Sequence, residues 1–481
     1  MIFRISIAAL ASLALCFASA AFADESARPN IVLINVDDLG WADLACQGSK
    51  YYKTPNIDRL ASQGMRFINA YAAASNCAPS RACMMTGQYG PRHGVYTVGS
   101  SDRGKAKNRK LIPTRNTTSI APDELTIAGL LKSAGYETIS IGKWHISSDP
   151  LLNGFDQNVA GCESGHPTKK LGGYHSPYNY PNCVSEKEGE YLTDRLTDEA
   201  IRFVGDNKDK PFFLYLPFYT VHTPIQPKQE KREKWKAIEK QPGQGNASYA
   251  AMIESLDENV GRLLASLDEL GVSDRTAVIF TSDNGGLWQI SHQAPLRAGK
   301  GSYFEGGIRV PLIVRWPGEV DPDSTCDEPV SNIDFMPTIA EIANAAIPEG
   351  KQIDGLSLTE LLQGSNAKLE QRSLFWHFPI YLQASGKSKG PFATHDPWFR
   401  TRPGSVVRSG KWKLHEYFED GRLELYDLKS DIGERTNVAA QHQEVVQRLH
   451  AELKNWRAQT SAPVPTELNP KYKPDSQTNG K

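Results

Sequence analysis

Short apolar runs alternate with amphipathic helical patterns over most of this chain, and this alternation constrains the fold more than any other feature. The runs that are apolar on both faces, and are therefore predicted to be buried strands, cover residues 31–36, 138–141, 212–216 and 277–281. The helical patterns that accompany them cover residues 55–64, 122–135, 193–204 and 248–270. This order predicts an α/β fold, with a large, mostly parallel sheet sandwiched by helices.

The pattern changes after about residue 365. Ser409-Gly410 separates two short apolar runs and Asp420-Gly421 precedes a third, which indicates hairpins, and a helical pattern follows over residues 443–456. We therefore expect one large domain over residues 24–365 and a C-terminal subdomain over residues 366–481, built from a small antiparallel sheet and one helix. The stretch from 381 to 402, rich in Gly, Pro and Lys, is predicted to be a long loop.

Residues 1–23 have the form of a signal peptide. Arg4 precedes an apolar run from Ile5 to Phe17, and Ala21-Phe22-Ala23 matches a cleavage site. A membrane anchor needs about 20 apolar residues, and this run is shorter. No later segment is apolar enough to span a membrane. We expect the mature chain to be exported to the periplasm or secreted, or to be lysosomal in a eukaryote.

The charge and cysteine content exclude two classes of protein. The 481 residues carry 54 basic and 55 acidic side chains, a formal net charge of −1, which does not fit a general nucleic-acid binder. Seven cysteines are too few for a disulfide scaffold, so burial must stabilise the core. Cys162 and Cys183, which are close in sequence, are the pair that we expect to form a disulfide.

Polar clusters follow four of the predicted strands. They are Asp37-Asp38, Lys143-Trp144-His145, His222 and Asp283-Asn284. The carboxyl ends of parallel strands share one sheet edge, so these side chains should meet there. By itself, each cluster is more often a solvated turn or helix cap. Together, the oxygens of Asp37, Asp38, Asp283 and Asn284 favour a site for Ca²⁺, or for Mg²⁺, over a zinc site.

A further motif, Cys77-Ala78-Pro79-Ser80-Arg81, is followed by Gly87 and Gly90. Here the chain resembles the formylglycine-dependent sulfatases of the alkaline-phosphatase-like superfamily. In that family, Cys-x-Pro-Ser-Arg directs conversion of the cysteine to formylglycine (3-oxoalanine) by a formylglycine-generating or maturase enzyme. The resemblance covers most of the mature chain and includes the four clusters above and Gly299-Lys300-Gly301.

The resemblance implies that the chain cleaves sulfate monoesters. Formylglycine hydrate at Cys77 would bind the cation as a ligand and attack sulfur, because a sulfate ester needs a strong nucleophile and neutralisation of its charge. Arg81, four residues further on, would hold the hydrate. Lys143 and Lys300 would bind sulfate oxygens.

The resemblance also implies the proton transfers. His222 or Lys300 would protonate the leaving alkoxide. His145 would take the proton of the second hydroxyl, so that the aldehyde reforms and sulfate leaves. General acid–base catalysis of this kind contributes roughly 10²–10⁴-fold to a rate.

The substrate is expected to be a sulfated glycan, because an exported enzyme meets extracellular polysaccharide, or else an aryl sulfate. Aromatic, His and Arg side chains in the long loops would contact the sugar. The candidates for substrate binding are His175, His377, Trp398, Arg400 and Arg402, with His166 and His395 in the same loops.

Two alternatives stay open from the sequence. The chain is a phosphate or phosphonate ester hydrolase of the same superfamily, although the pair Lys143 and Lys300 argues for sulfate. Alternatively, it is a non-catalytic binder of sulfated glycan, if Cys77 is not converted.

Overall fold

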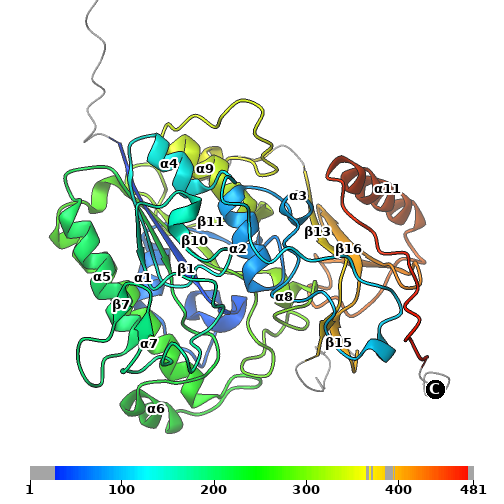
Figure 1. Cartoon of the computed structure of the whole chain (residues 1–481), viewed down its shortest axis with the longest axis horizontal. Coiled ribbons are helices and arrows are strands. Elements are labelled where there is room, and N and C mark those ends of the chain that lie inside the picture. Colours follow the sequence, from blue (N-terminus) through cyan, green and yellow to red (C-terminus); the bar gives the residue numbers. More distant parts are fainter. Residues whose placement is uncertain (1–27, 365–367, 370–371, 385–393, 395, 475–481) are drawn as a thin grey trace, which may run out of the picture.

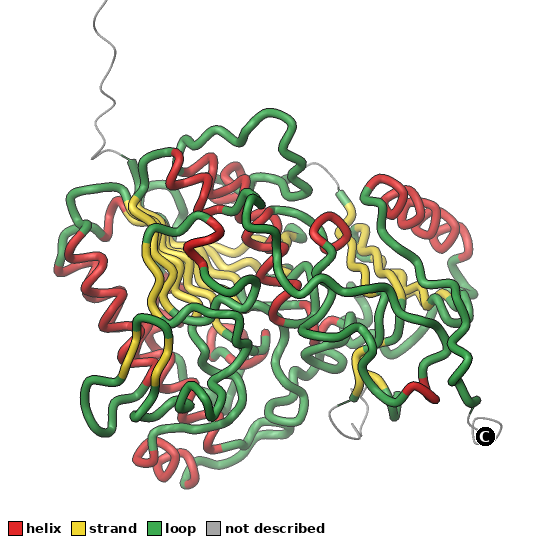
Figure 2. Tube along the Cα trace, in the orientation of Figure 1, coloured by secondary structure: helices red, strands yellow, loops and turns green. Residues whose placement is uncertain are grey.

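The computed structural model describes residues 28–364, 368–369, 372–384, 394 and 396–474. The predicted signal peptide and His395 lie outside these ranges. Figures 1 and 2 show a large sheet between two layers of helices, with a smaller sheet beside it that is covered by helix α11. This is the expected architecture. No helix among the described residues is both long and apolar enough to cross a bilayer.

The large sheet has eight strands in the order β11-β2-β10-β9-β1-β8-β4-β5. The four predicted strands form its centre as β1 (Asn30–Val36), β4 (Glu137–Ile141), β8 (Phe212–Pro217) and β9 (Thr276–Ser282). The others are β2 (Met65–Phe67), β5 (Gln157–Val159), β10 (Leu312–Arg315) and β11 (Ser324–Cys326). Strand β10 runs antiparallel to both β9 and β2, so the sheet is mixed toward that edge.

Apolar faces of the helices cover both sides of this sheet. One face packs against α1 (Pro55–Ser62), α5 (Leu192–Asp206) and α7 (Ala247–Glu269). The other packs against α2 (Cys77–Thr86), α4 (Ile127–Ser133), α9 (Phe335–Ile342) and α10 (Thr359–Gln363). Helix α4 begins later than expected because the Thr126 side chain caps it, accepting a hydrogen bond from the Gly129 amide.

The remaining elements of the large domain are short. The helices are α3 (Gly90–His93), α6 (Gln229–Lys236) and α8 (Glu305–Ile308). The strands are β3 (Ala70–Tyr71), β6 (Asn179–Tyr180), β7 (Cys183–Val184) and β12 (Val330–Ser331). Single 3₁₀ turns cover Trp41–Asp43, Ala45–Gln47, Ala106–Asn108, Pro150–Asn153, Ser273–Arg275 and Asn332–Asp334.

The C-terminal sheet confirms the hairpins. Its strands are β13 (Ser373–Phe378), β16 (Gly404–Ser409), β17 (Trp412–Tyr417) and β18 (Leu423–Asp427), all antiparallel neighbours in that order. Gly410 has a positive φ of 57° in the first hairpin turn. Helix α11 (Gln443–Gln459) covers the sheet, and Leu449 and Leu453 pack with Val407 and Leu414. The stretch expected to be only loop contains the strand pair β14 (Leu382–Gln383) and β15 (Phe399–Thr401).

The expected disulfide is wrong. Cys162 and Cys183 are both free thiols, as are Cys46, Cys77, Cys83 and Cys326. Cys183 lies in β7 and is part of the apolar core that packs against the large sheet. Burial in this core, rather than a disulfide bond, stabilises the region.

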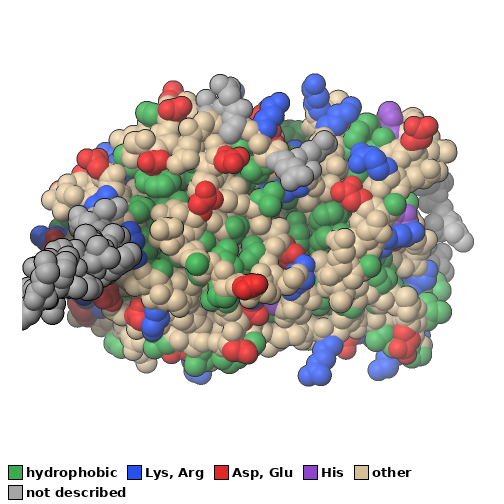
Figure 3. All heavy atoms as spheres, turned by 90° about the horizontal axis from the view of Figure 1, so that it is seen from above, with side chains coloured by type: hydrophobic (Ala, Val, Ile, Leu, Met, Phe, Trp, Pro, Cys, Tyr) green, Lys and Arg blue, Asp and Glu red, His purple; other side chains and the backbone are tan. Residues whose placement is uncertain are grey.

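Charged side chains of both signs are interspersed over the face of the molecule shown in Figure 3, in keeping with the near-zero net charge. The charges that organise the fold are buried instead. Between α8 and the C-terminal sheet, Lys413 Nζ lies 2.9 Å from Glu305 Oε1 and 3.1 Å from Glu434 Oε1. Arg309 Nε is 2.8 Å from Glu305 Oε2, and His415 Nε2 is 2.9 Å from Glu434. This network joins α8 to the C-terminal sheet.

We predict that Lys413→Met destabilises the protein by about 3–5 kcal/mol, because it leaves two buried carboxylates without their shared cation. Urea unfolding of the full chain measures this loss. The matched control is Lys411→Met, in the same hairpin. Lys411 is about half exposed, and its ion pair with Asp427 is expected to contribute only about 0–1 kcal/mol to stability. Equal losses for the two variants would contradict a structural role for the buried network.

Candidate active site

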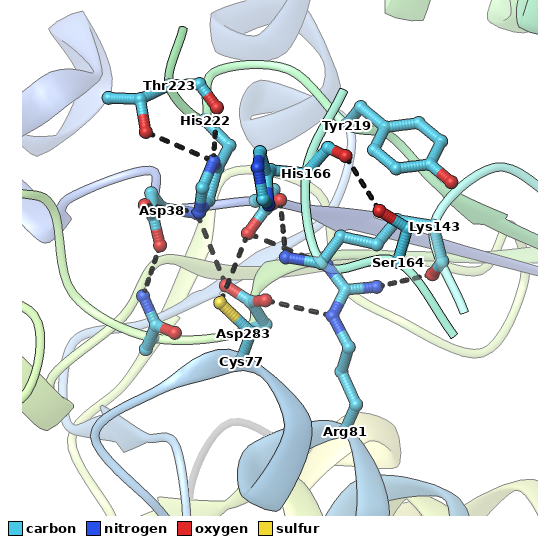
Figure 4. A network of polar contacts seen from close by, with 12 residues as sticks. Asp38, Cys77, Arg81, Lys143, Ser164, His166, Tyr219, His222, Thr223 and Asp283 are labelled. Carbon is cyan, nitrogen blue, oxygen red and sulfur yellow. Dashed lines mark hydrogen bonds and ion pairs between the residues drawn. The ribbon is translucent and has the colours of Figure 1, made fainter. Parts of the chain in front are cut away.

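The four polar clusters meet at one edge of the large sheet, together with the start of α2. The strand register places them there: Asn35 of β1 pairs with Pro217 of β8 and with Thr281 of β9, so the residues after each strand end lie level. Backbone hydrogen bonds continue past the strands, from Asp37 N to Thr220 O at 3.1 Å. Figure 4 shows Cys77 and Arg81 of α2 directed into this group of side chains.

Asp37 is fully buried and joins two other predicted site residues. Its Oδ2 accepts a hydrogen bond from Lys143 Nζ at 2.6 Å, and its Oδ1 lies 3.7 Å from Cys77 Sγ. Burial raises the pKa of Asp37 well above its ordinary value, although Lys143 and His222 act in the opposite direction. This carboxylate therefore lacks enough positive charge among the protein side chains around it.

Asp38 lies in the left-handed region, with a φ of 62°, and turns its carboxylate toward Lys300 and Asn284. Lys300 Nζ is 2.8 Å from Asp38 Oδ2, and Asn284 Nδ2 donates to Oδ1 at 2.8 Å. Burial alone would raise the pKa of Asp38, but the charges of Lys300, His222 and Lys143 hold it below its ordinary value. Asp38 is therefore ionised at neutral pH.

Arg81 crosses the floor of the site. It lies one helical turn after Cys77, on the same face of α2, and its side chain is completely buried. Its Nε donates to Asp283 Oδ2 at 2.9 Å and its Nη1 donates to the Lys143 carbonyl at 2.7 Å. Arg81 thus fixes three segments, α2 and the ends of β4 and β9, relative to one another.

Cys77 occupies the centre of the site, at the first residue of α2. Its Sγ lies 3.0 Å from Lys300 Nζ. Burial raises the pKa of this thiol, but Lys143 and Lys300 outweigh it and lower the pKa to about 6. The position therefore favours a negatively charged nucleophile.

Two histidines line the site with different protonation. Nδ1 of His222 lies 2.6 Å from the Thr223 carbonyl, so it carries a proton, and Nε2 is 3.6 Å from Asp38 Oδ2. His145 has a φ of 72° and a buried Nδ1 without a hydrogen-bond partner among the described residues. Burial, and then Lys143 and Arg81, lower the pKa of His145 well below its ordinary value, which leaves a neutral imidazole able to accept a proton.

A cavity of about 470 Å³ opens above Cys77. The lining includes the predicted residues Asp38, Cys77, His145, His222, Lys300 and Arg400, and also His166. Sequence reasoning missed other lining residues, namely Asn76, Val98, Arg103, Glu163, Ser164, Gly165, Thr223, Leu287 and Leu382. Most of them lie in loops without a motif. Asn76 directly precedes the cysteine motif, and this position in the sequence is the signal that could have identified Asn76 as a site residue.

The other four predicted substrate-binding residues do not line this cavity. His175 Nε2 contacts the Pro227 carbonyl, and Arg402 forms ion pairs with Asp396 and Glu419. His377 is buried in β13, where its two ring nitrogens contact Ser405 Oγ and the Pro463 carbonyl. Trp398 is 40% exposed and lies outside the lining. Of the five candidates, the structure brings only Arg400 to the site.

The donor set fits a divalent cation. Among the described residues, ligand atoms of Asp37, Asp38, Cys77 and His222 lie within 4.8 Å of one another. Within the described part of the chain, Asn284 Oδ1 is buried and has no hydrogen-bond partner, and Asp283 Oδ1 accepts only the Asp38 amide, at 3.2 Å. A cation would satisfy the orphaned amide oxygen and the undercompensated Asp37 carboxylate. His222, which the sequence did not include among the ligands, is part of this group.

The fold and the site together define a hydrolase of anionic esters with an alkaline-phosphatase-like architecture. A family model described as "Sulfatase" matches residues 29–345, and one described as "N-sulphoglucosamine sulphohydrolase, C-terminal" matches residues 299–459. The chain therefore belongs to the sulfatase family and is a sulfuric ester hydrolase.

Similar proteins include two sulfatases and one solved structure with a bound oligosaccharide. A "Sulfatase" of Formosa agariphila is 35% identical over 92% of this chain and 91% of its own length. A "Steryl-sulfatase" of Mus musculus is 31% identical over 92% of this chain and 84% of its own. The chain in the crystal structure of Ps i-CgsB in complex with k-i-k-neocarrahexaose has 30% sequence identity to this chain. The two structures match over 89% of this chain and 92% of that chain, with a TM-score of 0.72.

We predict that, in protein produced without conversion of Cys77 and kept free of metal by a chelator, Cys77 is the thiol that reacts first with iodoacetamide. The rate should rise with pH around a midpoint near 6, since a lowered pKa means that thiolate forms as the pH passes that value. In Lys300→Met the midpoint should move upward, because the cation beside the sulfur is lost. Peptide mass spectrometry measures the labelling.

Cys46 is the internal control for this labelling. It is more exposed than Cys77, but burial and Asp58 raise its pKa to about 12. If Cys46 reacted as fast as Cys77 at neutral pH, access rather than charge would control reactivity, and the electrostatic account of the site would be contradicted.

Proposed function

We propose that this sulfatase removes sulfate from a carbohydrate, with formylglycine at position 77 as the nucleophile and a Ca²⁺ ion, or Mg²⁺, in the site. The observation that carries this proposal is the placement of Cys77, which lies at the base of the cavity, 3.0 Å from Lys300 Nζ and next to Asp37. The sulfur stands where the hydroxyls of a formylglycine hydrate would lie. The hydrate supplies an oxygen nucleophile for sulfur and a second hydroxyl through which sulfate is released.

The side chains around position 77 have separate tasks. Lys300, which reaches both Asp38 and Cys77, is placed to hold a sulfate oxygen and the nucleophile together. Lys143 balances Asp37, and Arg81 fixes the start of the helix that carries residue 77. His145, neutral at the cavity wall, accepts a proton, and His222, whose Nδ1 is held by the Thr223 carbonyl, is the donor to the leaving group.

The proposed cation would be held by Asp37, Asp38, residue 77, Asp283 and Asn284, with His222 close to the same group. It would lower the pKa of the nucleophile and neutralise charge on the sulfate group. The oxygen-rich donor set after conversion of Cys77 supports a hard cation over zinc.

The lining of the cavity supports a sugar over a steroid as the substrate. Away from Cys77 it carries Arg103, Glu163, His166 and Arg400, while Val98, Leu287 and Leu382 are its few aliphatic side chains. A sterol would leave these charged groups desolvated without partners, whereas sugar hydroxyls and anionic substituents can satisfy them. The bound oligosaccharide in the similar structure of Ps i-CgsB adds support.

Processing and location belong to the same proposal. A formylglycine-generating or maturase enzyme would convert Cys77, and residues 1–23 would direct export to the periplasm or the exterior. The small sheet that begins at Ser373 supports a division between the catalytic domain and the C-terminal subdomain after residue 365.

The first test is activity together with the mass of the Cys77 peptide. Protein purified after co-expression with a formylglycine-generating enzyme should release sulfate from a sulfated oligosaccharide faster than from a steroid sulfate, and its Cys77 peptide should have the mass of formylglycine. Cys77→Ala should release none. Full activity in Cys77→Ala would refute the proposed nucleophile.

The role of His145 is tested by His145→Ala, which should lower kcat by roughly 10²–10⁴-fold, the contribution typical of a general base. The control is His442→Ala, at the start of α11 far from the cavity, which should keep its activity. A His145→Ala enzyme with kcat within a few-fold of the parent would exclude a proton-transfer role for this side chain.

Calcium should stabilise the fold, because a ligand that binds only the native state adds about 2.7 kcal/mol at a hundred times its Kd. We expect the melting temperature to fall when the metal is removed with a chelator and to recover with CaCl₂. The recovery should be absent in Asp37→Asn. It should persist in Asp43→Asn, a buried carboxylate near β1 that instead contacts Ser291, Gln293 and Tyr249. A calcium-dependent shift of equal size in both variants would contradict the proposed ligands.

A further inference from the structure

Two arginines of the cavity lining have no acidic partner among the described residues. Arg103 Nη1 donates only to the Val98 carbonyl, at 3.3 Å. In the ranges that the structure describes, Arg400 Nη1 contacts only the Lys300 carbonyl, at 3.4 Å, and its Nε is buried without a partner. The segment 385–393, which precedes β15 in the chain, contains lysines but no Asp or Glu. Both guanidinium groups therefore face the cavity with unused donors.

The structure holds these two arginines at the same wall. Gly104, next to Arg103, has a φ of 80° and packs against the ring of Phe399, next to Arg400; a Cβ there would lie 2.8 Å from Phe399 Cε1. Gly301, next to Lys300, allows Arg400 to pack closely against the chain, since a Cβ at position 301 would lie 2.8 Å from Arg400 Cδ. Arg400 thus sits beside the backbone of the residue that contacts Cys77.

This pairing of like charges is costly without an anion. Burial lowers the pKa of Arg103, and burial, with the nearby Arg103 charge, lowers that of Arg400 even though Asp38 acts in the opposite direction. The adjacent Arg402 differs: it forms ion pairs with Asp396 and Glu419, and its pKa is raised. Among the described residues, Arg402 thus has carboxylate partners, whereas Arg103 and Arg400 do not.

We propose that Arg103 and Arg400 form a second anion subsite, so that the substrate carries, beside the sulfate that is cleaved, another anionic group. Guanidinium groups bind sulfate and carboxylate oxygens through paired N–H donors, so the group is a second sulfate or the carboxylate of a uronic acid. Glu163, the other acidic residue of the lining, forms no ion pair with Arg103 or Arg400 among the described residues. This inference rests on the proposed function and narrows its substrate to a polyanionic sugar.

The test measures binding rather than turnover. Isothermal titration is done with Cys77→Ala, which cannot hydrolyse its ligand. The Kd of a monosulfated hexose is compared with the Kd of the disulfated hexose, for both galactose and glucosamine, and with the Kd of a sulfated galacturonic acid. The second anion should lower Kd by roughly tenfold or more, as charge-assisted hydrogen bonds do. Adding Arg103→Gln and Arg400→Gln should remove this advantage and weaken its dependence on salt. Adding Arg59→Gln, an exposed arginine of α1, should leave it intact.

The outcomes separate the inference from the proposed function. Tighter binding of a disulfated sugar assigns the subsite to sulfate, and tighter binding of the uronic acid assigns it to carboxylate. If no second anion lowers Kd, or if the advantage survives Arg103→Gln and Arg400→Gln, the subsite is refuted even when the parent enzyme releases sulfate. A parent enzyme that releases no sulfate, with the Kd advantage present, refutes the proposed function and leaves the anion subsite standing.

Discussion

The buried array of opposite charges at the edge of the large sheet is the constraint on which the rest of the structure depends. Asp37, Asp38 and Asp283 lie against Lys143, Lys300 and Arg81 with almost no exposure to water. Charges buried in this way destabilise a protein unless each has a partner at hydrogen-bond distance. The parallel register of β1, β8 and β9 brings the carboxylates level, and α2 brings Arg81 beneath them. The sheet and α2 therefore position the charged side chains of the array.

The C-terminal sheet contributes to the same array from a distance. Lys300 lies in the loop between β9 and α8, and α8 begins at Glu305. The buried network of Lys413, Glu434 and Glu305 holds the start of α8, and Arg400 of β15 lies against the Lys300 backbone. The C-terminal strands therefore fix one of the two lysines next to Cys77, and the separate strand pair of β14 and β15 supplies part of the wall of the cavity.

The sequence predicts the central strands and the meeting of the polar clusters at one sheet edge well, because long apolar runs and polar residues directly after them follow from the geometry of a parallel sheet. Short strands such as β2, with three residues, carry too little periodicity to be recognised. Arg103 was missed because nothing in its loop indicates that Gly104 packs against Phe399, almost 300 positions later in the chain. His377 looked like a loop residue that could bind a ligand, but its position in β13 buries it.

The central claim is that this charge array serves the cleavage of a sulfate ester, the reaction of the family to which the chain belongs. Three carboxylates face three basic side chains, His222 lies beside Asp38, and a divalent cation would give the site an excess of positive charge that an ionised nucleophile and an anionic ester offset. The most direct measurement is kcat/KM for 4-nitrophenyl sulfate and 4-nitrophenyl phosphate with the converted, calcium-loaded enzyme. The account predicts faster cleavage of the sulfate, and equal or faster cleavage of the phosphate would contradict it.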